Sequence, residues 1–240
     1  MFQKSHKQGE HVAIVGPTGS GKTLLGLELC KVIGARRATD GRPSRVTVLQ
    51  YKPRDDTLRQ ILPEKEWPII DHWPPNYGQE HVIVWPRGFK PSEASRRQRA
   101  VFLPLLDTIY QEGGQTVYIP EAAHFERPLP APGKSGGGLG MGGTMEEFWS
   151  GARSLKISVI SDTQRPRQVT RLMWSEPAWV MIFEPDDDDD LRRVAEMSGF
   201  KRDVFVAAHR LGEHEFLCVR RQRHAGQRVL YVSRVNVTRN

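Results

Sequence analysis

A glycine-rich loop followed by lysine and threonine is the part of this sequence best suited to chemistry. The loop comprises residues 16–23, the second part of the stretch 12–23, which reads Val-Ala-Ile-Val-Gly-Pro-Thr-Gly-Ser-Gly-Lys-Thr. Its glycines let successive backbone N–H groups face a polyphosphate, where side chains would block the approach. Lys22 can place a positive charge on the β- and γ-phosphates, and the Thr23 hydroxyl can ligate Mg²⁺. The stretch therefore predicts a binding site for a nucleoside triphosphate and its Mg²⁺.

Two regular elements must hold this loop in place. The apolar run 11–15 predicts a strand before the loop. Residues 23–33 predict a helix after it, and the positive N-terminal end of that helix would face the same anion. The residues expected to contact the nucleotide are those of the loop and the start of the helix: Gly16, Pro17, Thr18, Gly19, Ser20, Gly21, Lys22, Thr23 and Leu24.

An acidic residue after a second apolar strand would complete a site for hydrolysis. The run 116–119 predicts that strand, and Glu121 follows it where a base could activate water. Pro120 stands where such sites usually carry an aspartate for the Mg²⁺ shell, and proline can neither ligate a metal nor accept that hydrogen bond. Mg²⁺ is then expected on Thr23, the phosphates and water, with Asp162 of an adjacent strand as a candidate further acid. In the alternative interpretation, Glu121 is an ordinary exposed acid.

Two further polar residues are candidates for the reaction. Gln164 follows an expected strand at 155–160 and is placed like a sensor that touches the γ-phosphate. Arg153 precedes the same strand, and in a ring of subunits an arginine can reach a neighbour's nucleotide and stabilise the transferring charge. The sequence leaves open whether Arg153 has this role or is a surface arginine without a partner. The candidate catalytic residues are therefore Lys22, Glu121, Gln164 and Arg153.

The rest of the chain alternates apolar runs with helical patterns, which favours a parallel sheet with helices on both faces. Further strands are expected at 46–50, 69–70, 82–85 and 180–183. One long helix is expected at 92–112. The C-terminal runs 215–219 and 228–232 predict a β-hairpin around Ala225-Gly226 at the edge of the sheet. The expected fold class is α/β, with a twisted, mostly parallel sheet.

We expect a single domain over 1–240, with a C-terminal hairpin appendage over 213–240. The segment 128–143 is rich in glycine and proline, and such a composition does not hold one conformation by itself. We therefore expect a flexible loop there. The sequence leaves open whether this loop orders on DNA or on a neighbouring subunit, or has no consequence for function.

The composition is that of a basic protein. The 240 residues carry a formal charge of +7 at pH 7, with a sequence pI of about 9.6, which favours contact with nucleic acid or another acidic surface. The mean hydropathy is −0.52, and no apolar run approaches the roughly 20 residues that a membrane-spanning helix needs. Cys30 and Cys218 are expected as buried free thiols, as in the reducing cytoplasm.

Taken together, these motifs resemble the FtsK/HerA branch of the P-loop ATPases, and more closely its short single-domain members from actinobacterial phages and mobile elements. The resemblance covers about residues 8–235, and Thr-Gln-Arg-Pro after the loop is its most specific part. Besides the phosphate loop, the matching segments are 48–55 (Val-Leu-Gln-Tyr-Lys-Pro-Arg-Asp), 72–75 (His-Trp-Pro-Pro), 83–86 (Ile-Val-Trp-Pro), 116–122 (Thr-Val-Tyr-Ile-Pro-Glu-Ala), Phe148-Trp149 with Gly151 and Arg153, and 163–166 (Thr-Gln-Arg-Pro).

The resemblance implies a RecA-like core, ATP and Mg²⁺ as cofactors, and chemistry by Lys22, Thr23, Glu121 and Gln164. It also implies a homo-oligomeric ring, expected to be hexameric, that moves double-stranded DNA in the cytoplasm (the host cytoplasm if phage-encoded), without a membrane partner. The expected function is thus an ATP-dependent DNA translocase. Pro120 motivates an alternative, a nucleotide-gated binding or scaffold protein that binds ATP with little hydrolysis.

Overall fold

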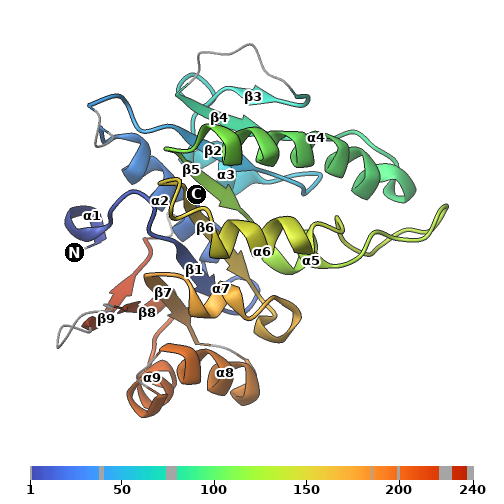
Figure 1. The fold of residues 1–240 in the computed structure, drawn as a ribbon. Helices are drawn as coiled ribbons and strands as arrows, with labels where there is room; N and C mark the ends of the chain where they lie inside the picture. The colour runs from blue at the N-terminus through green and yellow to red at the C-terminus, as the bar shows by residue number, and fades with distance from the viewer. Residues whose placement is uncertain are drawn as a thin grey trace.

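The structure, a computed structural model, describes residues 2–37, 41–73, 80–184, 186–198, 201–221 and 229–236. Nine strands in this part of the chain form one sheet that crosses the molecule (Figure 1). In spatial order they are β3 (Ile69–Ile70), β4 (His81–Val84), β2 (Val46–Leu49), β5 (Thr116–Ile119), β6 (Ser158–Thr163), β1 (Val12–Val15), β7 (Trp179–Phe183), β8 (Glu215–Arg220) and β9 (Val229–Arg234). The strands from β3 to β7 are parallel, whereas β8 and β9 form an antiparallel hairpin on β7.

Strand β6 lies between β1 and β5, and this order assembles the site. The register pairs Ile14 of β1 with Asp162 of β6, and Ile119 of β5 with Ser161. Because the three strands are parallel, their carboxyl ends meet at one edge of the sheet. The loops that follow them therefore converge there, which is the usual place for ligands in open α/β sheets.

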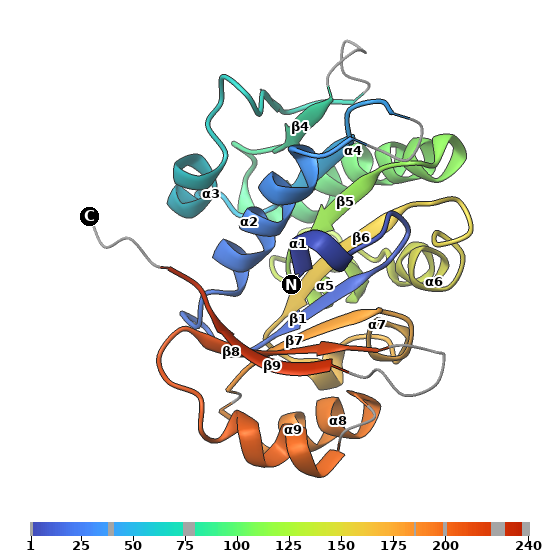
Figure 2. The ribbon, with the colours of Figure 1, turned by 90° about the vertical axis from the view of Figure 1, so that its left-hand side faces the viewer.

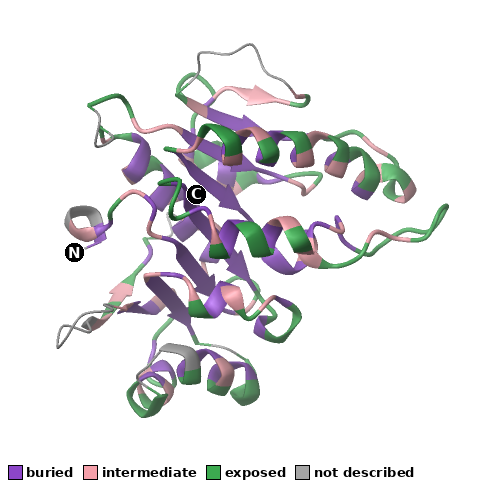
Figure 3. Ribbon diagram, in the orientation of Figure 1, coloured by how far each residue is buried: buried purple, intermediate pink, exposed green. Residues whose placement is uncertain are grey.

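Helices cover both faces of the sheet, and the strands from β4 to β8 are largely buried between them, whereas β3 is half-buried and β9 is partly exposed (Figures 2 and 3). One face carries α1 (Phe2–Ser5), α2 (Lys22–Gly34) and α3 (Asp56–Ile61). The other face carries α4 (Pro91–Glu112), α5 (Ala122–Glu126), α6 (Gly142–Ser150), α7 (Leu172–Ser175), α8 (Asp188–Ser198) and α9 (Lys201–Ala208), with a 3₁₀ turn η1 at Pro166–Gln168. No helix among the described residues is long and apolar enough to cross a membrane.

The long helix α4 shows why these segments fold as they do. It starts at Pro91, whose missing N–H costs nothing in the first turn. Its apolar residues recur at helical spacing, so Phe102, Leu106 and Ile109 are buried together against the sheet. It ends before Gly113, which has a positive φ of 66° that glycine adopts without a steric penalty.

The predicted strand at 155–160 is wrong by three residues, because β6 spans Ser158–Thr163. Residues 151–156 form a turn in which Lys156 has a φ of +57° and Leu155 is 37% exposed. β6 extends further because its last residues pair with β1, although they are polar. Asp162 therefore lies within a buried strand rather than in the turn that follows it.

The Gly/Pro-rich segment 128–143 projects from the body as a long arm between α5 and α6 (Figure 1). Its returning branch is anchored, since the N–H of Leu139 donates to the His124 carbonyl at 2.9 Å and that of Met141 to the Phe125 carbonyl at 2.8 Å. The last two residues of the range already belong to α6. Flexibility stays a prediction for the exposed residues between these anchors.

Two other predictions concern the C-terminal hairpin and the cysteines. The hairpin is confirmed as β8 and β9, while its expected turn at Ala225-Gly226 lies outside the described residues, as do the prolines of the 72–75 motif. Cys30 and Cys218 are both free and buried.

Candidate nucleotide-binding site

The loop between β1 and α2 has the geometry expected of a phosphate-binding loop. Gly19 and Gly21 have φ values of +81° and +105°, which glycine adopts without strain. Gly16 allows close packing on β7, because a Cβ there would lie 2.5 Å from the Cβ of Phe183. Since α2 begins at Lys22, its unpaired N-terminal N–H groups lie at this loop.

Lys22 lies folded over the loop rather than extended into solvent. It is 5% exposed, and its Nζ donates to the carbonyl oxygen of Pro17 at 2.6 Å. Burial lowers the pKa of Lys22, while the carboxylates of Asp162 and Glu121 act in the opposite direction. The ammonium group is therefore next to the loop, with two acidic side chains in its neighbourhood.

Glu121 follows β5 after Pro120 and is held by the end of β6. Its Oε1 accepts a hydrogen bond from Thr163 Oγ1 at 2.9 Å, and its Oε2 accepts one from the Gln164 N–H at 3.3 Å. Its φ of +49° is uncommon for a residue with a side chain and is typical of functional sites. Burial raises the pKa of Glu121, and the Asp162 carboxylate raises it further. Glu121 is thus half-buried and fixed by hydrogen bonds.

Gln164 connects β6 to the phosphate loop. Its Oε1 accepts a hydrogen bond from Thr18 Oγ1 at 2.8 Å, while its backbone N–H donates to Glu121. We call these contacts the Thr18–Gln164–Glu121 network. It joins the loop after β1 to the residues that follow β5 and β6. The phosphate loop and Glu121 are therefore linked by hydrogen bonds through Gln164.

Asp162 is 3% exposed and lies one strand away from Glu121. The Tyr118 hydroxyl donates to its Oδ2, and the Glu121 N–H donates to its Oδ1 at 3.3 Å. Burial raises the pKa of Asp162, whereas the Tyr118 hydrogen bond and the charge of Lys22 lower it. The residue that the sequence offered only as a candidate further acid is therefore part of this site.

These residues surround one cavity of about 580 Å³, a size within the usual range for small-molecule sites. Its walls come from the phosphate loop and α2, from the ends of β2, β5 and β6 and the residues that follow them, and from α3. The C-terminal segment contributes His214, before β8, and Asn236, after β9. The lining residues are Thr18, Gly19, Gly21, Lys22, Thr23, Leu24, Lys52, Thr57, Gln60, Ile61, Glu121, Asp162, Gln164, His214 and Asn236.

Sequence reasoning missed the part of this wall that comes from β2, α3 and the C-terminal segment. Lys52 is held in position by two contacts in the loop after β2. Its N–H donates to Gln50 Oε1 at 2.9 Å, and its Nζ lies 3.8 Å from Asp55 Oδ2. A polar run directly after an apolar strand was the available signal. His214, whose Nδ1 lies 3.2 Å from the Ser20 carbonyl oxygen, had no such signal.

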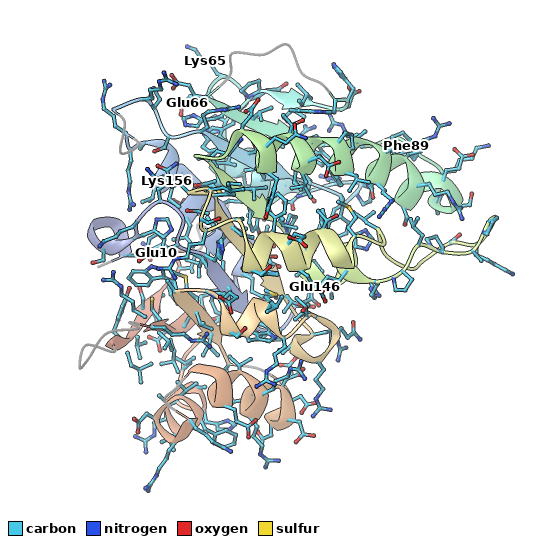
Figure 4. The ribbon with its side chains drawn as sticks, viewed as in Figure 1. Glu10, Lys65, Glu66, Phe89, Glu146 and Lys156 are labelled. Atoms are coloured by element: carbon cyan, nitrogen blue, oxygen red, sulfur yellow. The ribbon has the colours of Figure 1, made fainter. Side chains whose placement is uncertain are left out.

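Gly16, Pro17 and Ser20 belong to the phosphate loop but do not line the cavity, and among the predicted catalytic residues Arg153 is the one that the fold does not bring there. Figure 4 shows Glu10 and Lys156 at the edge where β1 and β6 begin, and the Lys156 N–H donates to the Arg153 carbonyl at 3.0 Å. At the same edge, the Gly9 N–H donates to Ser158 Oγ at 2.9 Å and joins the segment before β1 to the start of β6. Arg153 therefore lies at the edge opposite the cavity of its own chain. Its action on a neighbour's nucleotide stays a prediction.

Comparisons with known proteins identify the fold. Neither family models nor curated proteins gave a match to this sequence. The genome packaging NTPase B204 from Sulfolobus turreted icosahedral virus 2, in complex with AMPPCP, is similar with a TM-score of 0.64 and 14% identity, over 95% of this chain and 98% of that chain. VirB4 of Thermoanaerobacter pseudethanolicus is similar with a TM-score of 0.62 and 9% identity, over 95% of this chain and 90% of that chain.

The pCW3 conjugation coupling protein TcpA is similar with a TM-score of 0.53 and 14% identity, over 94% of this chain and 60% of that chain. At sequence identities this low, the structural similarity establishes a shared fold and nothing more. The predicted α/β, RecA-like P-loop fold is therefore confirmed, and the resemblance drawn from the sequence motifs fits these structures.

Proposed function

We propose that this protein is an ATP-dependent DNA translocase of the FtsK/HerA type, which hydrolyses ATP in a ring and moves double-stranded DNA. The observation that carries the proposal is the Thr18–Gln164–Glu121 network, which ties a phosphate loop to an acid and a polar sensor in one cavity. Structures of the same fold include a genome packaging NTPase bound to AMPPCP and a conjugation coupling protein. The charge of +7 suits an anionic partner such as DNA.

The site residues have separate tasks in this proposal. The loop 16–23 binds the triphosphate through its backbone N–H groups, and Lys22 exchanges the Pro17 carbonyl for a phosphate oxygen. Glu121 accepts a proton from the attacking water, for which its carboxylate must be ionised. Gln164 reports whether the γ-phosphate is present, because its side chain already contacts the loop through Thr18.

Mg²⁺ is the cofactor that such a reaction needs, and the oxygen donors of the cavity suit it. The Thr23 hydroxyl and the Asp162 carboxylate both line the wall, and Mg²⁺ prefers such hard ligands together with water and phosphate. These two side chains would hold the ion or its waters, and the ion would supply positive charge to offset the negative charge that develops on the phosphates.

A hexameric ring would bring Arg153 into the reaction from a neighbouring subunit. Arg153→Ala should then leave the affinity for ATP unchanged and lower kcat. In mixed rings, Arg153→Ala subunits should recover hydrolysis at sites whose Arg153 comes from a Glu121→Gln subunit. A ring of Arg153→Ala subunits that hydrolyses ATP at the wild-type rate would exclude this role.

The deciding experiment is ATP turnover with and without double-stranded DNA, with Glu121→Gln as the blank. We expect DNA to stimulate turnover, and we expect the variant to bind ATP while losing about 10²–10⁴-fold in rate. If DNA does not change the rate of turnover, the protein is an ATPase but the proposal that it translocates DNA is rejected.

Pro120 supports a second candidate, a nucleotide-gated scaffold that holds ATP with little hydrolysis. A proline at the end of β5 offers no oxygen to the metal shell. ATP binding without turnover, together with a large gain in hydrolysis for Pro120→Asp, would establish this candidate.

A further inference from the structure

Pro120 and Asp162 come next after the last paired residues of two neighbouring strands. The register of β5 and β6 ends with Ile119 opposite Ser161; Asp162 is the next residue of β6, and Pro120 is the first residue after β5. β6 also lies directly beside β1, which leads into the phosphate loop. The carboxylate absent from β5 is therefore found one strand nearer to the loop.

Asp162 has no cation in direct contact among the described residues, although the charges of Lys22 and Lys52 act on it from further away. It is 3% exposed, and it accepts hydrogen bonds from two neutral donors, the Tyr118 hydroxyl and the Glu121 N–H. Within the described residues, no lysine, arginine or histidine nitrogen lies within 4.0 Å of its carboxylate. A buried carboxylate without a paired cation is costly. The side of Asp162 that lines the cavity is where a cation can approach.

Tyr118 fixes the direction of this carboxylate. Its ring is fully buried against α2, where a Cβ on Gly26 would lie 2.7 Å from the ring. α2 is the helix that carries Lys22 and Thr23 at its start. Tyr118 thus sets Asp162 in a defined position relative to the helix that presents the Thr23 hydroxyl.

We infer that Asp162 supplies the metal-shell acid that Pro120 cannot, holding a water of the nucleotide's Mg²⁺ on the β6 side of the cavity, with Tyr118 as its positioning residue. A hydrated arrangement suits Mg²⁺, which keeps several waters when bound to nucleotides. The inference rests on the proposed nucleotide site and relocates one of its functions from β5 to β6.

The test measures binding and does not depend on turnover. The dissociation constant of a fluorescent ATP analogue is determined in Mg²⁺ and in EDTA, and Mn²⁺ affinity in the nucleotide complex is followed by electron paramagnetic resonance. Asp162→Asn should keep the affinity in EDTA and lose about tenfold or more in metal affinity. Tyr118→Phe should show a smaller loss of the same kind. Glu126→Gln, which removes a half-buried carboxylate outside the cavity, should match wild type.

A transplanted acid provides the second arm of the test. The double variant Pro120→Asp with Asp162→Asn should recover most of the metal affinity, because the carboxylate returns directly after β5. Pro120→Asp alone should change metal affinity less than twofold, since the role is already filled; this arm applies even where Asp162→Asn does not fold. A large gain in that single variant, or wild-type metal affinity in a folded Asp162→Asn protein, would overturn the inference. Wild-type protein that binds no nucleotide would instead overturn the proposed site itself.

Discussion

Thr18 Oγ1 donates to Gln164 Oε1 at 2.8 Å, although the two residues are 146 positions apart in the chain. The contact exists because β6 is inserted beside β1, so the residue after β6 reaches the loop after β1. It gives the proposed sensor a direct path to the phosphate loop, and its backbone continues that path to Glu121.

The first prediction concerns this contact. Thr18→Val and Gln164→Ala should each lower kcat/KM for ATP, and the double variant should lose less than the sum of the two losses in free energy. For residues in contact we expect a coupling of about 0.5–3 kcal/mol. Steady-state kinetics of the four proteins measures it. Additive losses would mean that the two side chains act independently during turnover.

The second prediction is a pH dependence of the reaction. Burial and Asp162 raise the pKa of Glu121, and only the ionised carboxylate can accept a proton. The rate kcat should therefore fall as the pH drops through this raised pKa, at a higher pH than an exposed glutamate would cause. The measurement is kcat between pH 5 and 9. A residual Glu121→Gln activity with the same acidic limb would assign that limb to another group.

The third prediction concerns stability at Glu126. Burial raises the pKa of Glu126 to about 7, while the Thr170 N–H that donates to its Oε2 at 2.6 Å lowers it. A carboxyl with a raised folded pKa favours the folded state below its unfolded value of 4.5, and that contribution is lost as the pH rises through 7. Glu126→Gln should thus raise Tm at pH 8 and change it little at pH 4. Thermal unfolding at both pH values tests this, and parallel pH curves for the two proteins would contradict it.

The fourth prediction uses two helical glycines whose surroundings differ. Gly26→Ala would place a Cβ 2.7 Å from the rigid ring of Tyr118, so it should destabilise the fold by about 1–3 kcal/mol. Gly143→Ala, in the first turn of α6, meets no atom within 4 Å and should be neutral or slightly stabilising. Chemical denaturation compares the variants. Equal stability of the two would show that Tyr118 shifts freely.

Much of the local structure could be predicted because its signals are local. The glycines of the loop, the apolar strand before it and the helix after it lie within 12–33, and the structure has β1 and α2 there. The end of β6 could not be predicted from hydropathy, since Asp162 and Thr163 are polar residues buried by their neighbours. Hydropathy therefore predicts the strand three residues too early.

The residues of the cavity divide along the same line. By itself the sequence determined the phosphate loop and the acid after β5, because each depends on residue types at short spacing. Only the tertiary structure decided that Asp162 contacts Tyr118 and Glu121, that His214 joins the cavity wall, and that Arg153 lies at the opposite edge. Strand order and register bring distant residues together, and they arise from packing of the whole sheet, which no short stretch of sequence encodes.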